Sequence, residues 1–349
     1  MRVRCYNNCM LTVLNALPEG LLSCEATELH RVLDGPTLIH LKGRRPEPLF
    51  VSVLLHGNED TGWQAARDLL CEYQGRDLPR ALSLFIGNVA AARHGRRRLD
   101  GQPDYNRVWS GSGVQEQEMM RQVIDDMLRR RVFASLDIHN NTGHNPHYAC
   151  INKLDNDFMQ LATLFSRTVV YFTKPDGVQS KAFSEICPAV TVECGQPSQP
   201  HGVEHAREFL HAALNLVALP EHPLPQSDID LFHTVAIVKV PEVLEISFDG
   251  QSNADISFPD DVDRLNFSEL PAETLLGWLG SERKSWLEAW DEQGLEVAEQ
   301  YFSYENNEIR LKVPVMPSML TCDSRIVRQD CLCYLMERMT LKTTVDQTV

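Results

Sequence analysis

The feature that most constrains the fold is a strand–helix–strand pattern over residues 49–86. Residues 49–55 are apolar except for Ser52, which is typical of a strand buried on both faces of a sheet. Apolar spacing predicts a helix over 61–73, and a second apolar run predicts a strand over 81–86. Strands joined through a helix are parallel, with the helix packed outside the sheet. The sequence therefore predicts an α/β fold.

The alternation of predicted strands and helices continues to about residue 222 and then stops. Further strands are predicted over 37–42, 132–138, 168–172 and 188–192, with helices over 116–131, 155–165 and 203–217. A turn is expected at 43–46. Beyond Pro225 the candidate strands are short and lack βαβ spacing; they cover 232–240, 243–248, 274–279, 297–304 and 309–313. We therefore predict a mixed, mostly parallel sheet flanked by helices in residues 1–222 and a smaller β-rich domain in residues 223–349.

Charge and cysteine usage narrow the functional class. The net charge of −15 argues against binding of a phosphate backbone, so we expect no nucleic-acid partner. No run approaches the roughly 18 apolar residues of a membrane span, so we expect no membrane segment. The ten cysteines lack paired, regular spacing, which favours reduced thiols in a cytoplasmic protein.

Polar residues follow three of the predicted buried strands. His56 and Glu59 follow the first, His139 ends the second, and Glu193 ends the third. The carboxyl ends of strands in an open α/β sheet meet at the edge where such folds bind ligands. Two histidines and a glutamate form the protein ligands of one class of catalytic zinc, which leaves a position for water. Glu193 would then accept the proton of that water and pass it to a leaving amine.

The loop between the predicted strand 81–86 and the predicted helix 116–131 supplies cations. One arginine of the Arg96-Arg-Arg98 run is a candidate to stabilise the oxyanion formed during carbonyl hydrolysis. Arg107 with Asn106 is a candidate to hold a substrate carboxylate, because the guanidinium group matches that anion's geometry. The alternative is a solvated basic loop, which we favour for Arg96 and Arg97.

Several motifs together resemble those of a known family. His56-Gly-Asn-Glu59, Asp104-Tyr-Asn106-Arg107, Leu136-Asp-Ile-His139 and Glu193-Cys-Gly195 have the order and spacing of the succinylglutamate desuccinylase/aspartoacylase family, whose members are relatives of the zinc carboxypeptidases. The resemblance covers roughly residues 50–210. The C-terminal part resembles that family's β domain more loosely.

The resemblance implies a zinc-carboxypeptidase-like fold and one zinc ion per chain. It implies zinc ligands at His56, Glu59 and His139, with Glu193 as general base and acid. It also implies Arg98 at the scissile carbonyl, with Arg97 as the alternative. Asn106 and Arg107 would hold a substrate carboxylate.

The sequence departs from the family near residue 183. The family carries a further arginine about ten residues before the catalytic glutamate, where this chain has Phe183-Ser184. The nearest cation is Lys181, which we assign to substrate binding. This departure predicts a substrate other than N-succinylglutamate or N-acetylaspartate, with a more apolar or differently charged acyl-amino acid in its place.

Three functions are consistent with these residues. The first is a zinc-dependent amidohydrolase that cleaves the amide bond of a small N-acyl amino acid. The second is a metallocarboxypeptidase that acts on a short peptide or a γ-glutamyl-type substrate. The third is a zinc-binding protein without turnover, against which the presence of both Glu193 and Arg107 argues. A homo-oligomer is possible in each case.

Overall fold

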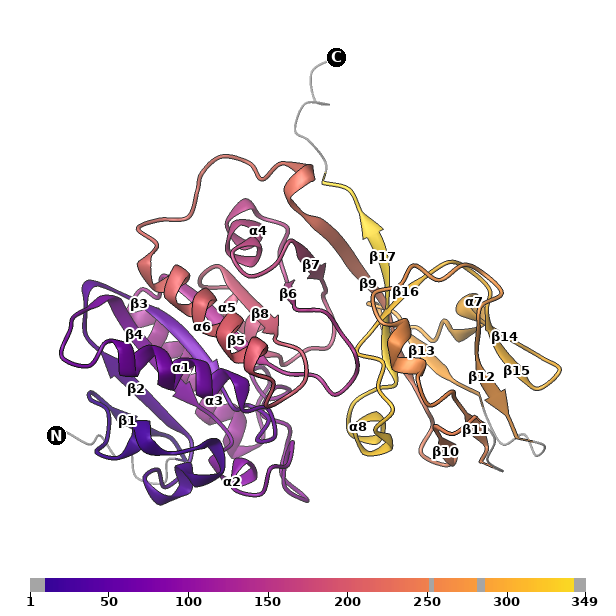
Figure 1. Ribbon diagram of the computed structural model, residues 1–349, viewed down its shortest axis with the longest axis horizontal. Helices are drawn as coiled ribbons and strands as arrows, with labels where there is room; N and C mark the ends of the chain where they lie inside the picture. The colour runs from indigo at the N-terminus through magenta and orange to yellow at the C-terminus, as the bar shows by residue number, and fades with distance from the viewer. Residues whose placement is uncertain (1–9, 251–253, 281–285, 342–349) are drawn as a thin grey trace, which may run out of the picture. The chain divides into compact units, whose positions relative to one another are not determined.

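The computed structural model describes residues 10–250, 254–280 and 286–341 (Figure 1). The chain forms two compact units, of which the first comprises residues 1–140 and 147–230. The second comprises 141–146 and 231–349, so a short segment of the N-terminal part belongs to it. The predicted boundary at residue 222 falls inside the first unit. That the two parts are independent domains stays a prediction.

The first unit is built on a mixed sheet whose strands run in the order β1-β2-β4-β3-β5-β8-β6-β7. These strands are β1 (Thr12–Leu14), β2 (Thr37–Leu41), β3 (Gly43–Val53), β4 (Leu78–Ile86), β5 (Ala134–His139), β6 (Tyr148–Ile151), β7 (Thr168–Tyr171) and β8 (Ala189–Glu193). The central neighbours β4, β3, β5 and β8 are mutually parallel, whereas β2 and β6 run antiparallel to β4 and β8. The predicted mixed, mostly parallel sheet is confirmed.

The turn expected at residues 43–46 is wrong, because these residues form the start of β3. Gly43 serves close packing instead of a turn. A β-carbon at this position would lie 2.1 Å from the backbone carbonyl carbon of Arg80 on the paired strand. The glycine therefore permits β3 to approach β4 at its beginning.

Helices cover both faces of this sheet. They are α1 (Thr61–Glu72), α2 (Val89–Ala92), α3 (Gln115–Arg129), α4 (Asn156–Thr163), α5 (Gln179–Phe183) and α6 (Pro200–Asn215). A β-carbon on Gly62 of α1 would lie 3.1 Å from Val53 and 3.0 Å from Ile138, so α1 packs closely on that face. Phe183 of α5 stacks on Phe50 at 4.4 Å between ring centroids. Because alternate strand residues face opposite sides, α5 lies on the other face of the sheet.

The second unit is β-rich, as predicted. Its strands are β9 (Asp230–Lys239), β10 (Ile246–Ser247), β11 (Ile256–Ser257), β12 (Leu275–Leu279), β13 (Glu288–Trp290), β14 (Phe302–Glu305), β15 (Glu308–Leu311), β16 (Met316–Ser318) and β17 (Cys333–Met339), with helices α7 (Ala298–Tyr301) and α8 (Ser324–Gln329). Strands β10-β11-β12-β15-β14 form one sheet, and β9 pairs with β13 and β17. The strand predicted over 297–304 is partly wrong, because its first half forms the short helix α7. The residues Ala298, Glu299 and Gln300 favour a helix.

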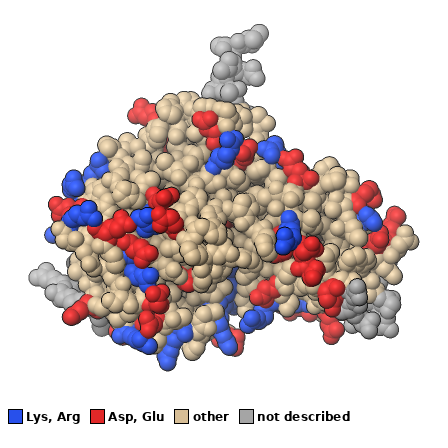
Figure 2. All heavy atoms as spheres, in the orientation of Figure 1, with Lys and Arg blue, Asp and Glu red and all other residues tan. Residues whose placement is uncertain are grey.

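Surface and thiol properties complete the description. Among the described residues, no helix combines the length and apolar character that a membrane crossing requires. The eight cysteines in the described part of the chain are free thiols, while Cys5 and Cys9 lie outside it. Figure 2 shows acidic side chains interspersed with basic ones over the visible face.

Candidate metal centre and active site

His56 and Glu59 occupy the tight turn between β3 and α1. The Glu59 amide donates to the His56 carbonyl oxygen at 3.2 Å. This turn places His56 Nδ1 2.8 Å from Glu59 Oε1, and both side chains are buried. Gly57 is needed between them, because a β-carbon there would lie 2.2 Å from the backbone nitrogen of Ala92. The glycine therefore allows α2 to pack directly against the turn.

His139 and Glu193 end two adjacent parallel strands, β5 and β8. The strands pair in a register that sets His139 opposite Glu193. Paired residues on neighbouring strands point to the same face of a sheet, about 5 Å apart. Both side chains are buried. The sheet thus places the predicted base beside the predicted ligand, although 54 positions separate them in the chain.

The three predicted metal ligands converge. His139 Nδ1 lies 2.7 Å from Glu59 Oε2, and His56 Nδ1 lies 2.8 Å from Glu59 Oε1. One ligand atom from each of the three residues lies within 4.8 Å of the other two. Among the described residues no other group of three acidic, histidine or cysteine side chains meets this distance. We call His56, Glu59 and His139 the metal centre.

A second layer of carboxylates orients both imidazoles. His56 Nε2 lies 3.0 Å from Asp104 Oδ1, and His139 Nε2 lies 2.8 Å from Asp137 Oδ2. An ionised carboxylate only accepts, so each ring donates its Nε2–H to the outer acid and, without a bound ion, its Nδ1–H to Glu59. Loss of the Nδ1 proton would turn that lone pair towards a metal ion. This orientation is the one that a metal ion between the Nδ1 atoms and Glu59 requires.

Asp104 and Asp137 were given no role from the sequence alone. Asp137 stands two residues before His139 on a strand, so the alternation of side chains places both on the same face. The spacing of two residues on a predicted strand is therefore a sequence signal that Asp137 lies beside His139. Asp104 has no comparable signal, because it reaches His56 from an irregular loop. Its Oδ1 also accepts from the backbone N–H of Asn106 at 2.7 Å, which fixes the carboxylate.

The charges of the metal centre depend on one another. Burial alone would raise the pKa of Glu59, but His56 and His139 outweigh it and hold that pKa well below its usual range. Burial alone would lower the pKa of His139, but Asp137 and Glu59 together raise it well above the ordinary value. Zinc binding here would therefore release a proton from the imidazoles.

The donor set fits zinc. Two imidazole nitrogens and a carboxylate form a His₂Glu arrangement, with second-layer carboxylates on both histidines. The Asn140 amide donates to Glu59 Oε2 at 3.2 Å, so the acidic ligand is also held from the backbone. The three side chains would supply three of the four positions of a tetrahedral zinc and leave the fourth open.

Arg97 and Arg98 have different environments. The Arg97 guanidinium donates to Asp104 Oδ2 through Nε at 3.2 Å and Nη2 at 2.9 Å, and Nη1 lies 3.8 Å from Glu59 Oε1. With 8% of its surface exposed, Arg97 does not belong to a solvated loop, and that expectation is wrong; Arg96 is exposed. Arg98 Nη1 donates to the Gln102 carbonyl at 2.9 Å. Its buried Nε has no hydrogen-bond partner among the described residues.

Asn106 and Arg107, which we call the anion grip, lie next to the metal centre. Asn106 is buried, and its Nδ2 is 3.3 Å from His139 Nε2. Arg107 is half-buried, and its Nη1 donates to the Asn106 carbonyl at 2.8 Å. The structure thus brings the amide of this pair to the metal ligands.

Lys181 has other partners. Its ammonium group donates to the Thr173 carbonyl oxygen at 2.6 Å and to Asp176 Oδ1 at 2.5 Å. These bonds close the loop that leads into α5. The predicted contact between Lys181 and a substrate stays a prediction.

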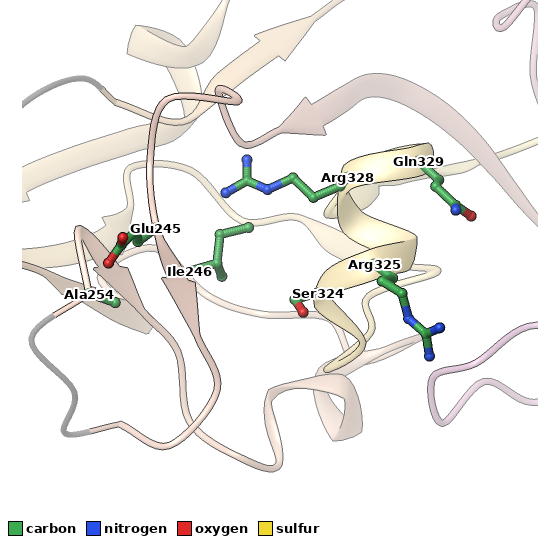
Figure 3. Close-up of a pocket in the computed structure, with 7 residues that line it drawn as sticks. All are labelled: Glu245, Ile246, Ala254, Ser324, Arg325, Arg328 and Gln329. Atoms are coloured by element: carbon green, nitrogen blue, oxygen red, sulfur yellow. The ribbon is translucent and has the colours of Figure 1, made fainter. Parts of the chain in front are cut away.

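The second unit contains a separate, shallow hollow of about 700 Å³ (Figure 3). It is lined by Glu245, Ile246, Ala254, Ser324, Arg325, Arg328 and Gln329. Arg328 is already engaged, because its Nη1 donates to the carbonyls of Val240 at 3.3 Å and Pro241 at 2.8 Å. Figure 3 shows Arg325 extending away from Ile246. This hollow lacks the convergent acidic and imidazole groups of the metal centre.

Comparison of the sequence with protein families finds a match over the part of the chain that contains these residues. Residues 48–219 match the model of the succinylglutamate desuccinylase/aspartoacylase catalytic domain. The matched segment contains every residue of the metal centre, the anion grip and Glu193. Residues 48–219 form a catalytic domain of the succinylglutamate desuccinylase/aspartoacylase family. Members of this family are deacylase hydrolases.

Solved structures share the family fold. Succinylglutamate desuccinylase from Chromobacterium violaceum is 16% identical, with a TM-score of 0.55 over 86% of this chain and 87% of that one. A mutant of murine aminoacylase 3 is 14% identical, with a TM-score of 0.56 over 85% and 95% of the two chains. A product-bound ectoine utilization protein from Ruegeria pomeroyi is 14% identical, with a TM-score of 0.53 over 87% and 88%. Among curated proteins, comparison finds no match.

Phe183, where we predicted a departure from the family, has a structural role. Phe183 is fully buried and stacks on Phe50, and Trp109 meets it edge-on at 5.7 Å. The aromatic ring therefore belongs to the packing of α5 on the sheet. The position at which the resemblance led us to expect an arginine is therefore occupied by a residue of the hydrophobic core.

Proposed function

We propose that this protein is a zinc-dependent hydrolase that cleaves the amide bond of an N-acyl amino acid. The observation that supports it is the convergence of His56, Glu59 and His139 beside Glu193, which the β5–β8 register sets next to His139. Family membership supports the reaction class. Zinc, when bound by this donor set, lowers the pKa of a water molecule and polarises a carbonyl oxygen.

Glu193 would move the proton that hydrolysis requires. It accepts a proton from the attacking water as the oxygen bonds to the acyl carbon. It returns that proton to the nitrogen as the carbon–nitrogen bond breaks, so the products are a carboxylate and an amine. Its carboxylate is close to two thiols: burial, and then Glu193, raises the pKa of both Cys150 and Cys194. Both thiols therefore stay neutral near pH 7.

Arg98 is our candidate for the donor to the carbonyl oxygen. Its Nη1 is anchored to the Gln102 carbonyl, while the buried Nε has no partner among the described residues. Arg97 is already committed to Asp104, which in turn holds His56. We assign Arg97 to the orientation of that ligand and Arg98 to the developing oxyanion.

Asn106 and Arg107 would hold the α-carboxylate of the substrate. The guanidinium group offers a planar pair of donors, and the amide adds a neutral one. Because Phe183 stands where the family resemblance led us to expect an arginine and is buried, we expect a substrate other than N-succinylglutamate or N-acetylaspartate, with a more apolar or differently charged acyl-amino acid in its place. The ectoine utilization protein from Ruegeria pomeroyi, which shares this fold, has been solved with its product bound.

A hydrolysis screen tests the proposal. Purified protein, loaded with zinc or stripped by a chelator, is incubated with N-acyl amino acids of different acyl length and charge and with dipeptides. We expect release of free acyl acid from at least one N-acyl amino acid by the zinc-loaded form alone. Shortening of peptides without deacylation would favour the carboxypeptidase alternative. Metal uptake without turnover of either class would refute the hydrolase proposal.

Replacement of the proposed base gives the matched test. Glu193→Gln keeps the size of the side chain but removes the proton acceptor, so kcat should fall by roughly 10²–10⁴-fold while zinc stoichiometry is unchanged. Glu185→Gln, on the exposed surface, is the control and should have no effect. Undiminished turnover of Glu193→Gln would refute the assigned role.

A further inference from the structure

The orientation of the Asn106 amide is fixed from outside the metal centre. Its Oδ1 accepts a hydrogen bond from the backbone N–H of Gln179 at 2.9 Å. A backbone N–H can only donate, so the atom that faces Gln179 must be the oxygen. The NH₂ group therefore faces the other way, towards His139 Nε2 at 3.3 Å.

His139 does not consume that NH₂ group. Its Nε2 is 2.8 Å from Asp137 Oδ2, and a carboxylate only accepts, so Nε2 carries a hydrogen. A ring nitrogen that donates to Asp137 cannot also accept from Asn106. The Asn106 amide hydrogens are thus donors presented at the edge of the metal centre, where an oxygen of the substrate would accept them.

The Gln179 amide is itself held firmly. Gly177 lies against the grip, because a β-carbon there would be 2.3 Å from the Arg107 carbonyl oxygen, and its φ of +78° suits glycine. The Trp109 amide donates to the Gly177 carbonyl at 2.9 Å. The Gln179 side chain is fully buried and donates through Nε2 to Ser135 Oγ at 2.6 Å. Residues 177–179 are therefore fixed to the 106–109 segment and to β5.

We propose that the Gln179 backbone amide is a positioning group that locks Asn106 as a hydrogen-bond donor and so makes the grip selective for a carboxylate over a carboxamide. A flipped Asn106 would present its carbonyl oxygen to the substrate, repel a carboxylate and accept from a carboxamide instead. Gln179 acts through Asn106 and does not itself contact the substrate. This inference rests on the proposed function, because it concerns the same substrate.

The backbone conformation at residue 179 permits a substitution that removes its N–H. Gln179 is the first residue of α5, where proline is tolerated, and Val178 before it has φ −81° and ψ 152°, the extended conformation that a following proline requires. Gln179→Pro removes the N–H and the side-chain bond to Ser135. Gln179→Ala removes only the side-chain bond and is the matched control.

We expect Gln179→Pro to raise KM for the N-acyl amino acid by roughly five- to tenfold over Gln179→Ala, the value of one hydrogen bond, with kcat within about twofold. The α-carboxamide analogue of that substrate should show no such increase, so discrimination between the two should narrow. Zinc stoichiometry and the melting temperature should match those of Gln179→Ala. The proposal would be overturned if Gln179→Pro and Gln179→Ala had the same KM for the N-acyl amino acid and the same preference for it over the carboxamide analogue.

A second variant leaves α5 untouched. Asn106→Asp keeps an oxygen towards Gln179 but replaces the NH₂ group with a second oxygen, which would repel a carboxylate. Calorimetry with the free amino acid product, which needs no turnover, should then show at least tenfold weaker binding than wild type. Unweakened binding would overturn the proposal even if Gln179→Pro fails to fold. Wild-type protein that binds the product but hydrolyses nothing would count against the proposed function alone.

Discussion

Two groups of histidines in the first unit have opposite surroundings. His56 and His139 each lie between two carboxylates. By contrast, His147 stacks on both His201 and His205, and we call these three residues the imidazole stack. The pKa values of His139 and His147 are therefore shifted in opposite directions. Carboxylates raise the pKa of His139, while burial, followed by His205 and His201, lowers the pKa of His147 to about 4. Histidines alone do not make a metal centre; their acidic partners do.

Hydrogen bonding inside the imidazole stack shows why. His205 Nε2 faces the Phe165 carbonyl oxygen at 2.8 Å, so it must donate. His205 Nδ1 then accepts from His147 Nδ1, which is 2.7 Å away. The Nδ1 atoms of His147 and His205 are thus used on each other, and both rings stack with Phe165. In the metal centre, by contrast, the outer nitrogens bond to carboxylates and the inner ones stay directed at a shared point.

The largest expected effect separates the two groups by zinc binding. Zinc at a hundred times its Kd should raise the free energy of unfolding of the wild type by about 2.7 kcal/mol. His139→Ala should abolish this increase, because one of three ligands is lost. His205→Ala, from the imidazole stack, is the control and should retain it. Thermal or urea unfolding with and without zinc measures the difference; full stabilisation of His139→Ala would refute the assigned centre.

The next effect concerns Asp104 and Asp137, the carboxylates that contact the outer nitrogens of His56 and His139. They distinguish the metal centre from the imidazole stack. Asp137→Asn should weaken zinc binding by about 10–100-fold, because the amide no longer fixes or polarises His139. Asp104→Asn should lie at the lower end of that range, since Asp104 is shared with Arg97. Competition titration with a chromophoric chelator gives both affinities.

Asp126→Asn is the control for this pair. Asp126 also contacts a histidine, His40, at 2.9 Å, but it lies outside the metal centre. Its replacement should leave zinc affinity unchanged. Equal weakening by all three substitutions would indicate a general loss of stability in place of a specific role for the second layer.

Sequence reasoning reached the metal centre because sheets impose periodicity. Strand ends, side-chain alternation and parallel order sufficed to place His56, Glu59, His139 and Glu193 at one edge, and the predicted sheet and β-rich second part are confirmed. Loops carry no comparable pattern. The burial of Arg97 depends on a contact with Asp104 seven residues away across an irregular turn.

The segment before β8 shows the same limit. Helix α5 is only five residues long, too short for an apolar period to be recognised, and it was not predicted. Strand β6 is four residues long and was missed for the same reason. The bond from the Gln179 backbone to Asn106 involves no side chain of Gln179, so residue identity could not have revealed it.

A smaller effect concerns how the free energy of unfolding depends on pH through His147 of the imidazole stack. A histidine whose pKa is lower in the folded state contributes stability above its unfolded pKa, near 6.5, and this stability is lost as the pH falls towards about 4. His147→Gln cannot take up a proton, so its unfolding free energy should decline less than that of the wild type between pH 6.5 and 4.5. Urea unfolding at several pH values measures the two slopes. Parallel slopes would show that His147 is not the group that titrates.

The smallest effect concerns His201, which is exposed and stacks on His147 at 5.2 Å with an 8° angle between the ring planes. Its replacement by alanine should change the free energy of unfolding by no more than about 0.5 kcal/mol, as for most surface substitutions. Burial is the main cause of the low pKa of His147, followed by His205, with His201 last. Loss of His201 should therefore raise that pKa only slightly, and His205→Ala should raise it more. Titration of the imidazole resonances by NMR ranks the two variants, and the reverse order would mean that stacking, rather than the nitrogen contact with His205, controls the charge of His147.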